Sequence, residues 1–564
     1  MIPLLLSLSA LAAPPTAESQ QLLLGVMEEE LARATSELHL PDESPPWWLS
    51  YEVVDGEVTT VYADFGAVMA RETRPHRVLR VESRAGDSSF DSANFAAFGE
   101  PGGVLSAHLP HEDDPVALGR ELWLATDIAY KQSVEQLSRK VAELPPGDQS
   151  EEKPPAMYPV TPTVDLDAQP FTIDAPGLEE RITHLSGVLA EYPQLESGVA
   201  AGSDWQGVRL LVNSEGTKLA TETGYVVIRV EAVYKHSDGS RLRNGRSWVA
   251  RHAGELPPIE QMEAEVREMA DWLVALEDAP VLKEYLGPVL FDDAASVELY
   301  RQLAAAEFVG TPPEAEGRGM FGEAPIARAT ARVGRRLMPA GWRVVDTPDT
   351  PGAAGRYTYD HEGVPGQEVE LVEDGVVRRV LMSRIPADVD GESTGHGRGL
   401  GSSRREAMPS NVRVEPKRSR RLKALERKGL RMAQQTGNEG LLVIRRIEPP
   451  AVTEDFDVTF MGDGPGAGLT RPYEAYLLLP DGTQQPVRGL QFSGVDRRVL
   501  RDAVMAGETA DYVGVMDGPP GSERFYIGPV GGLPGAWAVP PVLISELELD
   551  GSSGGDQRVL ARPE

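Results

Sequence analysis

The sequence predicts an α+β fold, in which strand-rich runs and helices occupy separate stretches of the chain. Two observations predict this class. β-rich runs follow one another over residues 208–251, and strands dominate again from Trp342 onward, whereas the helical segments stand apart from these runs. This separation is typical of α+β proteins, because α/β proteins alternate strand and helix along the chain.

Length and composition set the first limits. The chain has 564 residues, 41% of them apolar, so it is long enough for several domains with their own cores. Its net charge of −32 repels phosphate backbones, so we expect no nucleic-acid partner. No apolar run approaches the roughly 20 residues of a membrane helix, so we expect no membrane span. Cysteine is absent, which excludes disulfides, thiol catalysis and thiolate metal ligands.

The N-terminal residues resemble a targeting signal. Residues 2–13 are largely apolar and end in mostly small residues, as in a secretory signal peptide, although no Lys or Arg precedes them. We therefore expect residues 1–13 to be a signal peptide and the protein to be periplasmic or secreted. The alternative is a cytoplasmic protein with an apolar N-terminus.

Spacing and turn residues predict the individual elements. Apolar residues at i, i+3 and i+4 predict helices over 20–38, 116–144, 177–192, 258–276 and 293–309. Asp55-Gly56 predicts a hairpin between strands 48–54 and 57–62, because Asp-Gly suits a tight type I′ turn. Further turns are expected at 213–216, 238–239, 374–375 and 481–482.

Changes in composition divide the chain. Proline concentrates between residues 145 and 170, which predicts an exposed, extended linker. The expected parts are a signal peptide (1–13), an N-terminal α/β region (20–144), a Pro-rich linker or insertion (145–175), the remainder of the N-terminal and central region (176–285), a β-rich C-terminal domain (286–550) and a flexible tail (551–564).

Several stretches, taken in order, resemble the TldD/PmbA metallopeptidase family over residues 20–550. They are Leu122–Lys131, Val212–Thr217, Tyr359–Gln367 with Val372–Val376, Glu392–Arg398, and Tyr473–Leu477 with Pro486–Leu490. The resemblance implies an N-terminal α/β domain with helices on a sheet, a C-terminal domain of large, mostly antiparallel sheets, and a hollow dimer. It also implies that working members cleave unfolded peptides at an internal zinc site.

By the same resemblance, the active subunit carries His-Glu-x-x-x-His on a helix and a Cys late in the chain, which together hold zinc and activate its water. Counting without gaps from Gly287 places these helix positions on Arg301, Gln302 and Ala306. A guanidinium offers no lone pair, an amide is a poor base, and alanine has no ligand atom. We therefore expect no catalytic residue, no metal ligand and no cofactor.

By the same resemblance, the TldE/PmbA-like subunits of the family also lack these zinc ligands. We expect a structural or peptide-binding subunit, either a homodimer or a heterodimer with a TldD-type subunit, with unfolded peptide as its ligand. One alternative is an active metallopeptidase that uses other ligands or ligands from a partner. A second alternative is an exported scaffold or binding protein.

A glycine-rich loop is the candidate peptide-channel segment, because glycine lets another backbone approach closely. Its residues are Ser393, Thr394, Gly395, His396, Gly397 and Arg398. The alternative is a plain flexible loop.

Four other motifs favour structural roles. His108-x-x-His111-Glu112-Asp113-Asp114 lies between prolines and indicates a solvated loop rather than a metal site. The pair His361-Glu362 stands in a turn context, not on a helix. The string 391–395 matches G-x-S-x-G but lacks the strand and helix of a nucleophile elbow. The basic stretch 417–435 indicates a helix with a solvated face, or a dock for an acidic partner.

Overall fold

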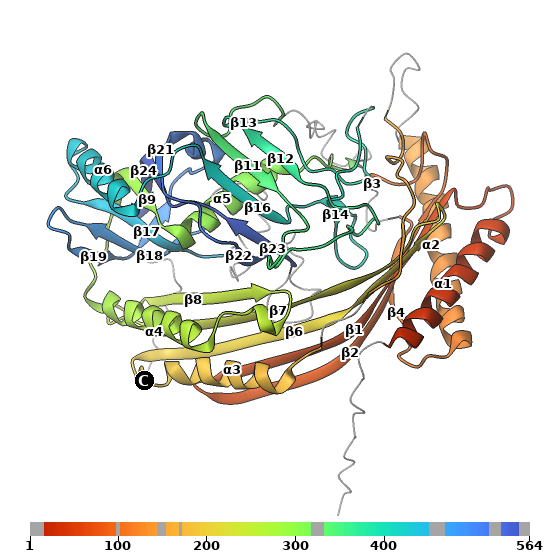
Figure 1. Ribbon diagram of the computed structural model, residues 1–564, viewed down its shortest axis with the longest axis horizontal. Helices are drawn as coiled ribbons and strands as arrows, with labels where there is room; N and C mark the ends of the chain where they lie inside the picture. The colour runs from red at the N-terminus through yellow and green to blue at the C-terminus, as the bar shows by residue number, and fades with distance from the viewer. Residues whose placement is uncertain are drawn as a thin grey trace, which may run out of the picture.

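The structure is a computed structural model that describes residues 16–96, 102–143, 154–168, 172–316, 332–389, 391–449, 469–517 and 532–551. The expected signal peptide lies outside these residues, as does the expected tail from residue 552 onward. The N-terminal half is a long, curved sheet with helices on its outer face, and the C-terminal half lies over its inner face (Figure 1). The predicted α+β class is confirmed.

The N-terminal sheet has the strand order β4-β2-β1-β6-β7-β5, with β8 also paired to β7. Its strands are β1 (Trp48–Asp64), β2 (Ala67–Arg84), β4 (Val104–His108), β5 (Val164–Asp165), β6 (Leu195–Asn213), β7 (Lys218–Lys235) and β8 (Arg241–Ala250). Its helices are α1 (Ala17–Glu37), α2 (Pro115–Glu143), α3 (Ala175–Leu189) and α4 (Ile259–Ala275). Helices α1 and α2 cover one end of the outer face, and α3 and α4 cover the other (Figure 1).

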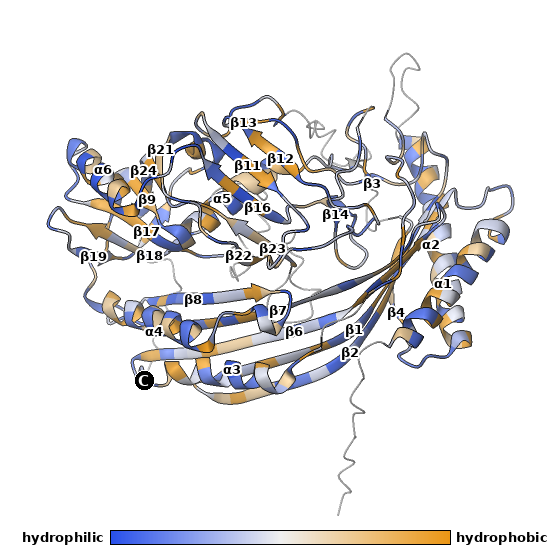
Figure 2. Cartoon of the chain, in the orientation of Figure 1, coloured by the Kyte–Doolittle hydropathy of each residue, from blue (hydrophilic) through white to orange (hydrophobic). Residues whose placement is uncertain are grey.

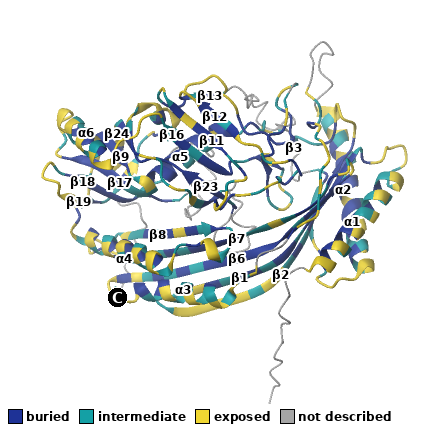
Figure 3. Ribbon diagram, viewed as in Figure 1, coloured by how far each residue is buried: buried dark blue, intermediate teal, exposed yellow. Residues whose placement is uncertain are grey.

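Side-chain alternation along β1 gives the sheet two different faces. Tyr51 and Val53 pack in a core with α1 and α2, and Val61 and Ala63 pack in a core with α3 and α4. The alternate residues of β1 point to the opposite face of the sheet, where Val58 packs against Met516 of the C-terminal half. Figure 3 shows that the strands are mostly buried, whereas the helices expose their outer sides.

The C-terminal half contains two large sheets. One has the order β13 (Val376–Val377), β12 (Val369–Glu373), β11 (Trp342–Asp346), β16 (Asn411–Pro416), β23 (Leu533–Ala538) and β22 (Val513–Asp517). The other has the order β19 (Gln484–Val487), β18 (Pro472–Leu478), β17 (Leu441–Ile447), β9 (Glu284–Phe291), β24 (Val542–Gly551) and β20 (Leu490–Phe492), with β21 (Ala503–Ala506) on β24. Short pairs are β3 (Phe95–Ala96) with β10 (Ala315–Glu316), and β14 (Gly397–Arg398) with β15 (Glu406–Ala407).

Helix α5 (Asp293–Phe308) lies between these two sheets, because one buried cluster joins Leu299 of the helix to Phe291 and Trp537 of the sheets. Helix α6 (Leu422–Gln435) packs on the other face of the β9 sheet through Leu425. Figure 2 shows the apolar character of the central strands in this half. Short 3₁₀ helices are Ala253–Glu255, Leu276–Asp278 and Arg497–Asp502. No helix among the described residues is long and apolar enough to cross a membrane.

The five helices predicted from periodicity are confirmed as α1 to α5, with ends within three residues of those expected. The basic helix was predicted too long. It begins at Leu422 rather than at 417, because Ser419 bridges to Ala506 and the Arg420 N–H donates to the Ala506 carbonyl, which keeps this segment extended.

The predicted hairpin at Asp55-Gly56 is wrong, because both residues lie in the middle of β1. The turn instead uses Phe65 and Gly66, at φ of 43° and 82°. The Asp55 carboxylate accepts from the buried Arg77 guanidinium at 3.0 Å. A Cβ on Gly56 would lie 2.7 Å from the Trp205 ring. These two residues therefore serve contacts across the sheet, which override their local preference for a turn.

The described part of the predicted linker, residues 154–168, is extended and partly exposed, but it is anchored at Tyr158. This side chain is buried. Its hydroxyl accepts from the Ala387 and Asp388 N–H groups, both at 3.0 Å, and donates to the Asp388 carbonyl. The segment therefore ties the N-terminal sheet to the C-terminal half.

We predict that Tyr158→Phe lowers the free energy of unfolding by about 1–2 kcal/mol, because two partly buried N–H groups lose their acceptor. Urea unfolding measures the change. The matched control is Tyr62→Phe, at a residue 39% exposed. A Tyr158 variant as stable as the control would show that the hydroxyl does not anchor the segment.

Candidate functional site

The candidate site begins at α5, which follows β9 directly. The Asp292 carboxylate accepts from the Asp293 N–H at 2.8 Å and caps the helix. Buried Leu299 and Leu303 set the rotation of the helix between the two sheets. The sequence-predicted positions 301, 302 and 306 therefore have defined surroundings.

Arg301 is held by two carboxylates. Its guanidinium lies 2.9 Å from Glu298 on the preceding turn and 2.8 Å from Asp517 on β22, and it donates to the Met516 carbonyl at 3.2 Å. Its side chain is only 10% exposed. Burial alone would lower the pKa of Arg301, but the charges of Glu298 and Asp517 raise this pKa above its usual value. The group is therefore a permanent, protein-supplied cation.

Gln302 is fixed at both ends of its amide. The amide nitrogen donates to Glu298 at 2.9 Å and to the Thr470 hydroxyl at 3.0 Å. The amide oxygen accepts from the Thr470 N–H at 2.9 Å. An amide in this position orients its neighbours but cannot take a proton from water.

Position 306 points elsewhere. Ala306 is exposed, and its carbonyl accepts from Arg332 at 2.5 Å. Residues five apart in a regular α-helix are rotated by about 140° around the axis, which is why Arg301 turns inward and Ala306 outward. These side chains do not fit zinc, because neither the guanidinium nor the methyl group can ligate it. Within the described ranges, no three His, Cys, Asp or Glu side chains gather as a metal-holding group.

The glycine-rich loop 393–398 is packed inside the chain. Its described side chains are buried, and His396 has no exposed surface. The His396 ring lies 3.3 Å from the Asp346 carboxylate and 3.0 Å from the Thr394 hydroxyl. A Cβ on Gly395 would lie 2.1 Å from the Pro365 carbonyl oxygen, so only glycine fits there. The loop packs the C-terminal half within one chain, and its channel-lining role stays a prediction.

The other residues of this loop also face protein groups. Ser393 donates to the Met382 carbonyl at 3.3 Å, and Arg398 donates to the Pro409 and Pro534 carbonyls at 3.1 and 2.8 Å. Among the described residues, no strand leads directly into Ser393 and no helix begins directly after it. The G-x-S-x-G string is therefore not a nucleophile elbow.

A buried carboxyl pair lies beside this loop. Asp360 accepts from the N–H groups of Glu362, Val364 and Gly397, each at 2.8–2.9 Å. Glu362 accepts from the backbone N–H of Arg384 at 2.7 Å. Burial raises the pKa of Glu362 to about 8, and the nearby charge of Asp360 adds to the rise. Glu362 therefore holds a proton at neutral pH, whereas Asp360 carries the charge.

The His361-Glu362 pair and the His108 cluster are engaged in contacts within the fold. His361 is buried, with its Nδ1 2.8 Å from the Gly399 carbonyl oxygen. In the His108 cluster, His111 is exposed, Asp113 pairs with Arg77 at 2.9 Å, and Asp114 caps α2 by accepting from the Val116 N–H. Both agree with the structural interpretation of these motifs.

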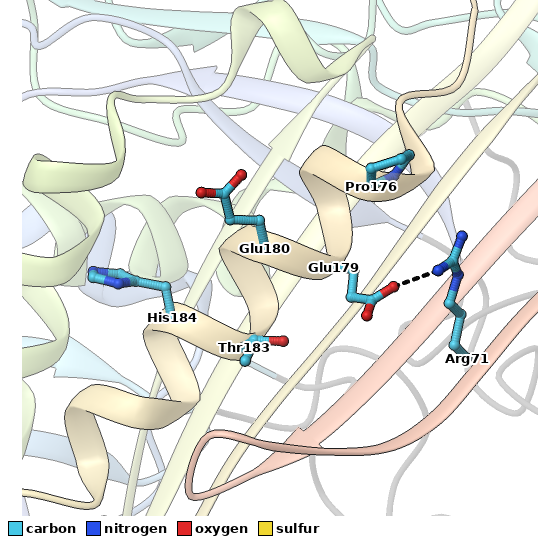
Figure 4. A pocket seen from close by; sticks show the side chains of 6 residues that line it. All are labelled: Arg71, Pro176, Glu179, Glu180, Thr183 and His184. Carbon is cyan, nitrogen blue, oxygen red and sulfur yellow. Dashed lines mark hydrogen bonds and ion pairs between the residues drawn. The ribbon is translucent and has the colours of Figure 1, made fainter.

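An open groove of about 610 Å³ lies on the outer face, along α3. Arg71 of β2 and Glu179 of α3 form an ion pair at 2.6 Å across it (Figure 4). The groove is lined by Arg71, Pro176, Glu179, Glu180, Thr183 and His184. It contains none of the residues that the sequence predicted for the site.

A charged seam between the two halves was missed by the sequence reasoning. We define it as Glu52, Arg80, Glu82, Arg209 and Arg405. Arg405 of a C-terminal loop donates to the Glu52 carboxylate at 2.8 Å, and Arg80 lies 2.8 Å from Glu82. The alternation of charged with apolar residues along β1 and β2 indicates a charged sheet face, but it does not show that the C-terminal half covers this face.

Comparisons with known proteins agree with this architecture. Residues 283–551 match the family profile described as PmbA/TldA metallopeptidase C-terminal domain. A metalloprotease of Synechocystis sp. is 30% identical over 199 residues, which are 35% of this chain and 41% of that protein. A metalloprotease of Methanocaldococcus jannaschii is 35% identical over 86 residues, 15% of this chain and 19% of that protein. The chain thus aligns with less than half the length of either relative.

A solved structure extends the likeness of fold to nearly the whole chain. TldE from Thermococcus kodakarensis superposes with a TM-score of 0.57, at 13% identity, over 94% of this chain and 100% of that one.

We predict that Arg301→Leu lowers the free energy of unfolding by about 3–5 kcal/mol, because Glu298 and Asp517 lose their buried cation. Chemical denaturation measures the change. Arg498→Leu is the matched control, because Arg498 pairs with Asp496 at an exposed site. If both variants unfolded alike, Arg301 would not be the group that neutralises the two carboxylates.

We predict that Glu362→Gln makes stability less dependent on pH. Between the unfolded pKa of about 4.3 and the folded pKa near 8, the folded state keeps a proton that the unfolded state releases, so wild-type stability falls as pH rises. The slope is at most about 1.4 kcal/mol per pH unit. Thermal unfolding should therefore show the stability of the variant rising relative to that of wild type as the pH increases from acid to 8. A constant difference, as expected for the exposed Glu373→Gln, would refute the protonated state.

Proposed function

Since residues 283–551 make this chain a member of the PmbA/TldD metallopeptidase family, we propose that it acts as a subunit of this kind without a zinc site of its own. The observation that carries the proposal is the state of Arg301. A guanidinium clamped between Glu298 and Asp517 lies where the family resemblance calls for a zinc ligand. A fixed cation there would also repel a metal ion.

The surrounding geometry supports the same function. Gln302 uses both ends of its amide in protein contacts, and Ala306 turns away from Arg301 on the helix. Binding zinc at these positions would therefore require new side chains. We propose a structural or peptide-binding role, with unfolded peptide as the ligand class.

The proposed partner is a TldD-type subunit, with a second copy of this chain as the other arrangement. The likeness in fold to TldE over 94% of the chain supports a TldE-like subunit. In such a complex the zinc chemistry would belong to the partner, and this chain would complete the fold around the peptide.

We predict that the purified full chain holds far less than one zinc per chain and does not cleave an unfolded peptide. Elemental analysis after dialysis measures the metal, and a peptide-hydrolysis assay with and without a chelator measures activity. A stoichiometric, tightly held zinc, together with hydrolysis that the chelator abolishes, would overturn the proposal.

A second measurement addresses the partner. The chain is mixed with a TldD-type subunit from the same host and passed over a size-exclusion column. Co-elution, with hydrolysis that depends on the partner's zinc, is the expected result. Failure to co-elute would argue against the heterodimer and favour a homodimer or an exported scaffold.

A further inference from the structure

The charged seam contains more hydrogen-bond donors than acceptors. Four buried nitrogen atoms of the seam find no acceptor among the described residues: Nε of Arg80, Nε of Arg209, and Nε and Nη1 of Arg405. The side chains of Arg80 and Arg405 are 7% and 3% exposed. A buried donor without a partner is costly, and more so when it carries a charge.

Strand register brings these donors to one face of the sheet. Glu52 of β1 lies directly opposite Arg80 of β2. On its other side, Arg209 of β6 pairs with Val54, so Arg209 is diagonal to Glu52 on the same face. Arg405 reaches the same carboxylate from the C-terminal loop at 2.8 Å. Three guanidinium groups therefore surround the single carboxylate of Glu52.

Within the seam, the three arginines Arg80, Arg209 and Arg405 face two carboxylates, Glu52 and Glu82, so positive charge is in excess there. Glu82 is shared between Arg80 and Arg84, both at 2.8 Å. The Nε of Arg209 lies 3.8 Å from Glu52, a distant ion pair, and the charge of Asp360 also acts on Arg209. Burial lowers the pKa of Arg405 to about 10, and although Glu52 opposes the change, the charges of Arg80 and Arg209 add to it. Burial and the charges of Arg209 and Arg405 also lower the pKa of His361, so its ring is neutral.

We propose that the charged seam binds a small tetrahedral oxyanion of the phosphate class between Arg80, Arg209 and Arg405. Four unmet nitrogen donors suit the four oxygens of such an ion better than the two oxygens of a carboxylate. The added negative charge would offset the excess positive charge of the seam.

Glu52 gives the site a preference among oxyanions. Its Oε2 is buried and accepts no hydrogen bond from the described residues. Although burial raises the pKa of Glu52, Arg405, Arg209 and Arg80 together lower it below its usual value, so the group is ionised. Hydrogen phosphate carries an O–H that can donate to this oxygen, whereas sulfate at neutral pH has none. The site therefore selects phosphate over sulfate.

The loop 399–405 supplies the route of entry. Ser403 is exposed, and its carbonyl accepts from Arg80 at 3.4 Å, a long contact that a small movement would break. Arg405 at the end of the same loop is a ligand of the proposed ion. Binding would therefore also tie this loop of the C-terminal half to the N-terminal sheet.

The test is isothermal titration of the full chain with inorganic phosphate at constant ionic strength, followed by the same titration with sulfate. We expect saturable binding of phosphate and at least about tenfold weaker binding of sulfate, the size of one charged hydrogen bond. Because this arm uses the unmodified chain, it does not depend on a variant that folds. Absence of saturable binding by phosphate would overturn the proposal and would mean that ordered water meets these donors.

Two variants assign the binding to the seam. Arg209→Met should weaken phosphate binding about tenfold or more, since it removes a charged donor, whereas Arg498→Met, at an exposed arginine, should leave it unchanged. Glu52→Gln should bring sulfate binding close to phosphate binding, because the acceptor charge is gone. Unchanged phosphate affinity in Arg209→Met, or equal binding of the two ions by wild type, would overturn the site.

Discussion

A buried arginine keeps its charge, and this constraint runs through the whole structure. Arginine does not lose its proton in a protein interior, so each one that folds inside needs a carboxylate or other acceptor nearby. Arg77 meets Asp55 within the N-terminal sheet, and Arg246 meets Glu474 across the two halves at 2.7 Å. Arg384 meets Glu215 in the same way. Ion pairs of this kind join the halves and limit how they can be arranged, because moving either half would leave a buried charge without its partner.

Helix α5 follows the same rule at Arg301, the position where the family resemblance calls for a zinc ligand. A metal ion and a guanidinium both bring positive charge to surrounding carboxylates, but only the metal can activate water. In this chain the cation is a side chain, with Glu298 and Asp517 committed to it. The helix keeps its packing between the sheets, and Arg301 on its inner face holds it to β22 through Asp517. The charged seam differs, since there the arginines outnumber the carboxylates they contact.

Periodicity was enough to predict most helices, because apolar spacing depends on neighbours along the chain and is kept in the fold. Asp55-Gly56 shows where local preference fails: Arg77 and Trp205, far along the sequence, decide its conformation. Tyr158 was hidden in a stretch whose prolines indicate an exposed linker. The seam could not be predicted, since Arg405 and Glu52 are 353 residues apart. The motif positions on α5 came from ordered resemblance, but only the structure shows that positions 301 and 306 point in different directions.

The cation among the carboxylates of α5 is a protein side chain, not a metal ion. A crystal structure from crystals soaked in zinc, with anomalous diffraction recorded at the zinc absorption edge, tests this assignment. We expect density for the Arg301 guanidinium between Glu298 and Asp517, and no anomalous peak along α5. An anomalous peak at the Arg301 end of the helix, with the guanidinium displaced, would contradict it.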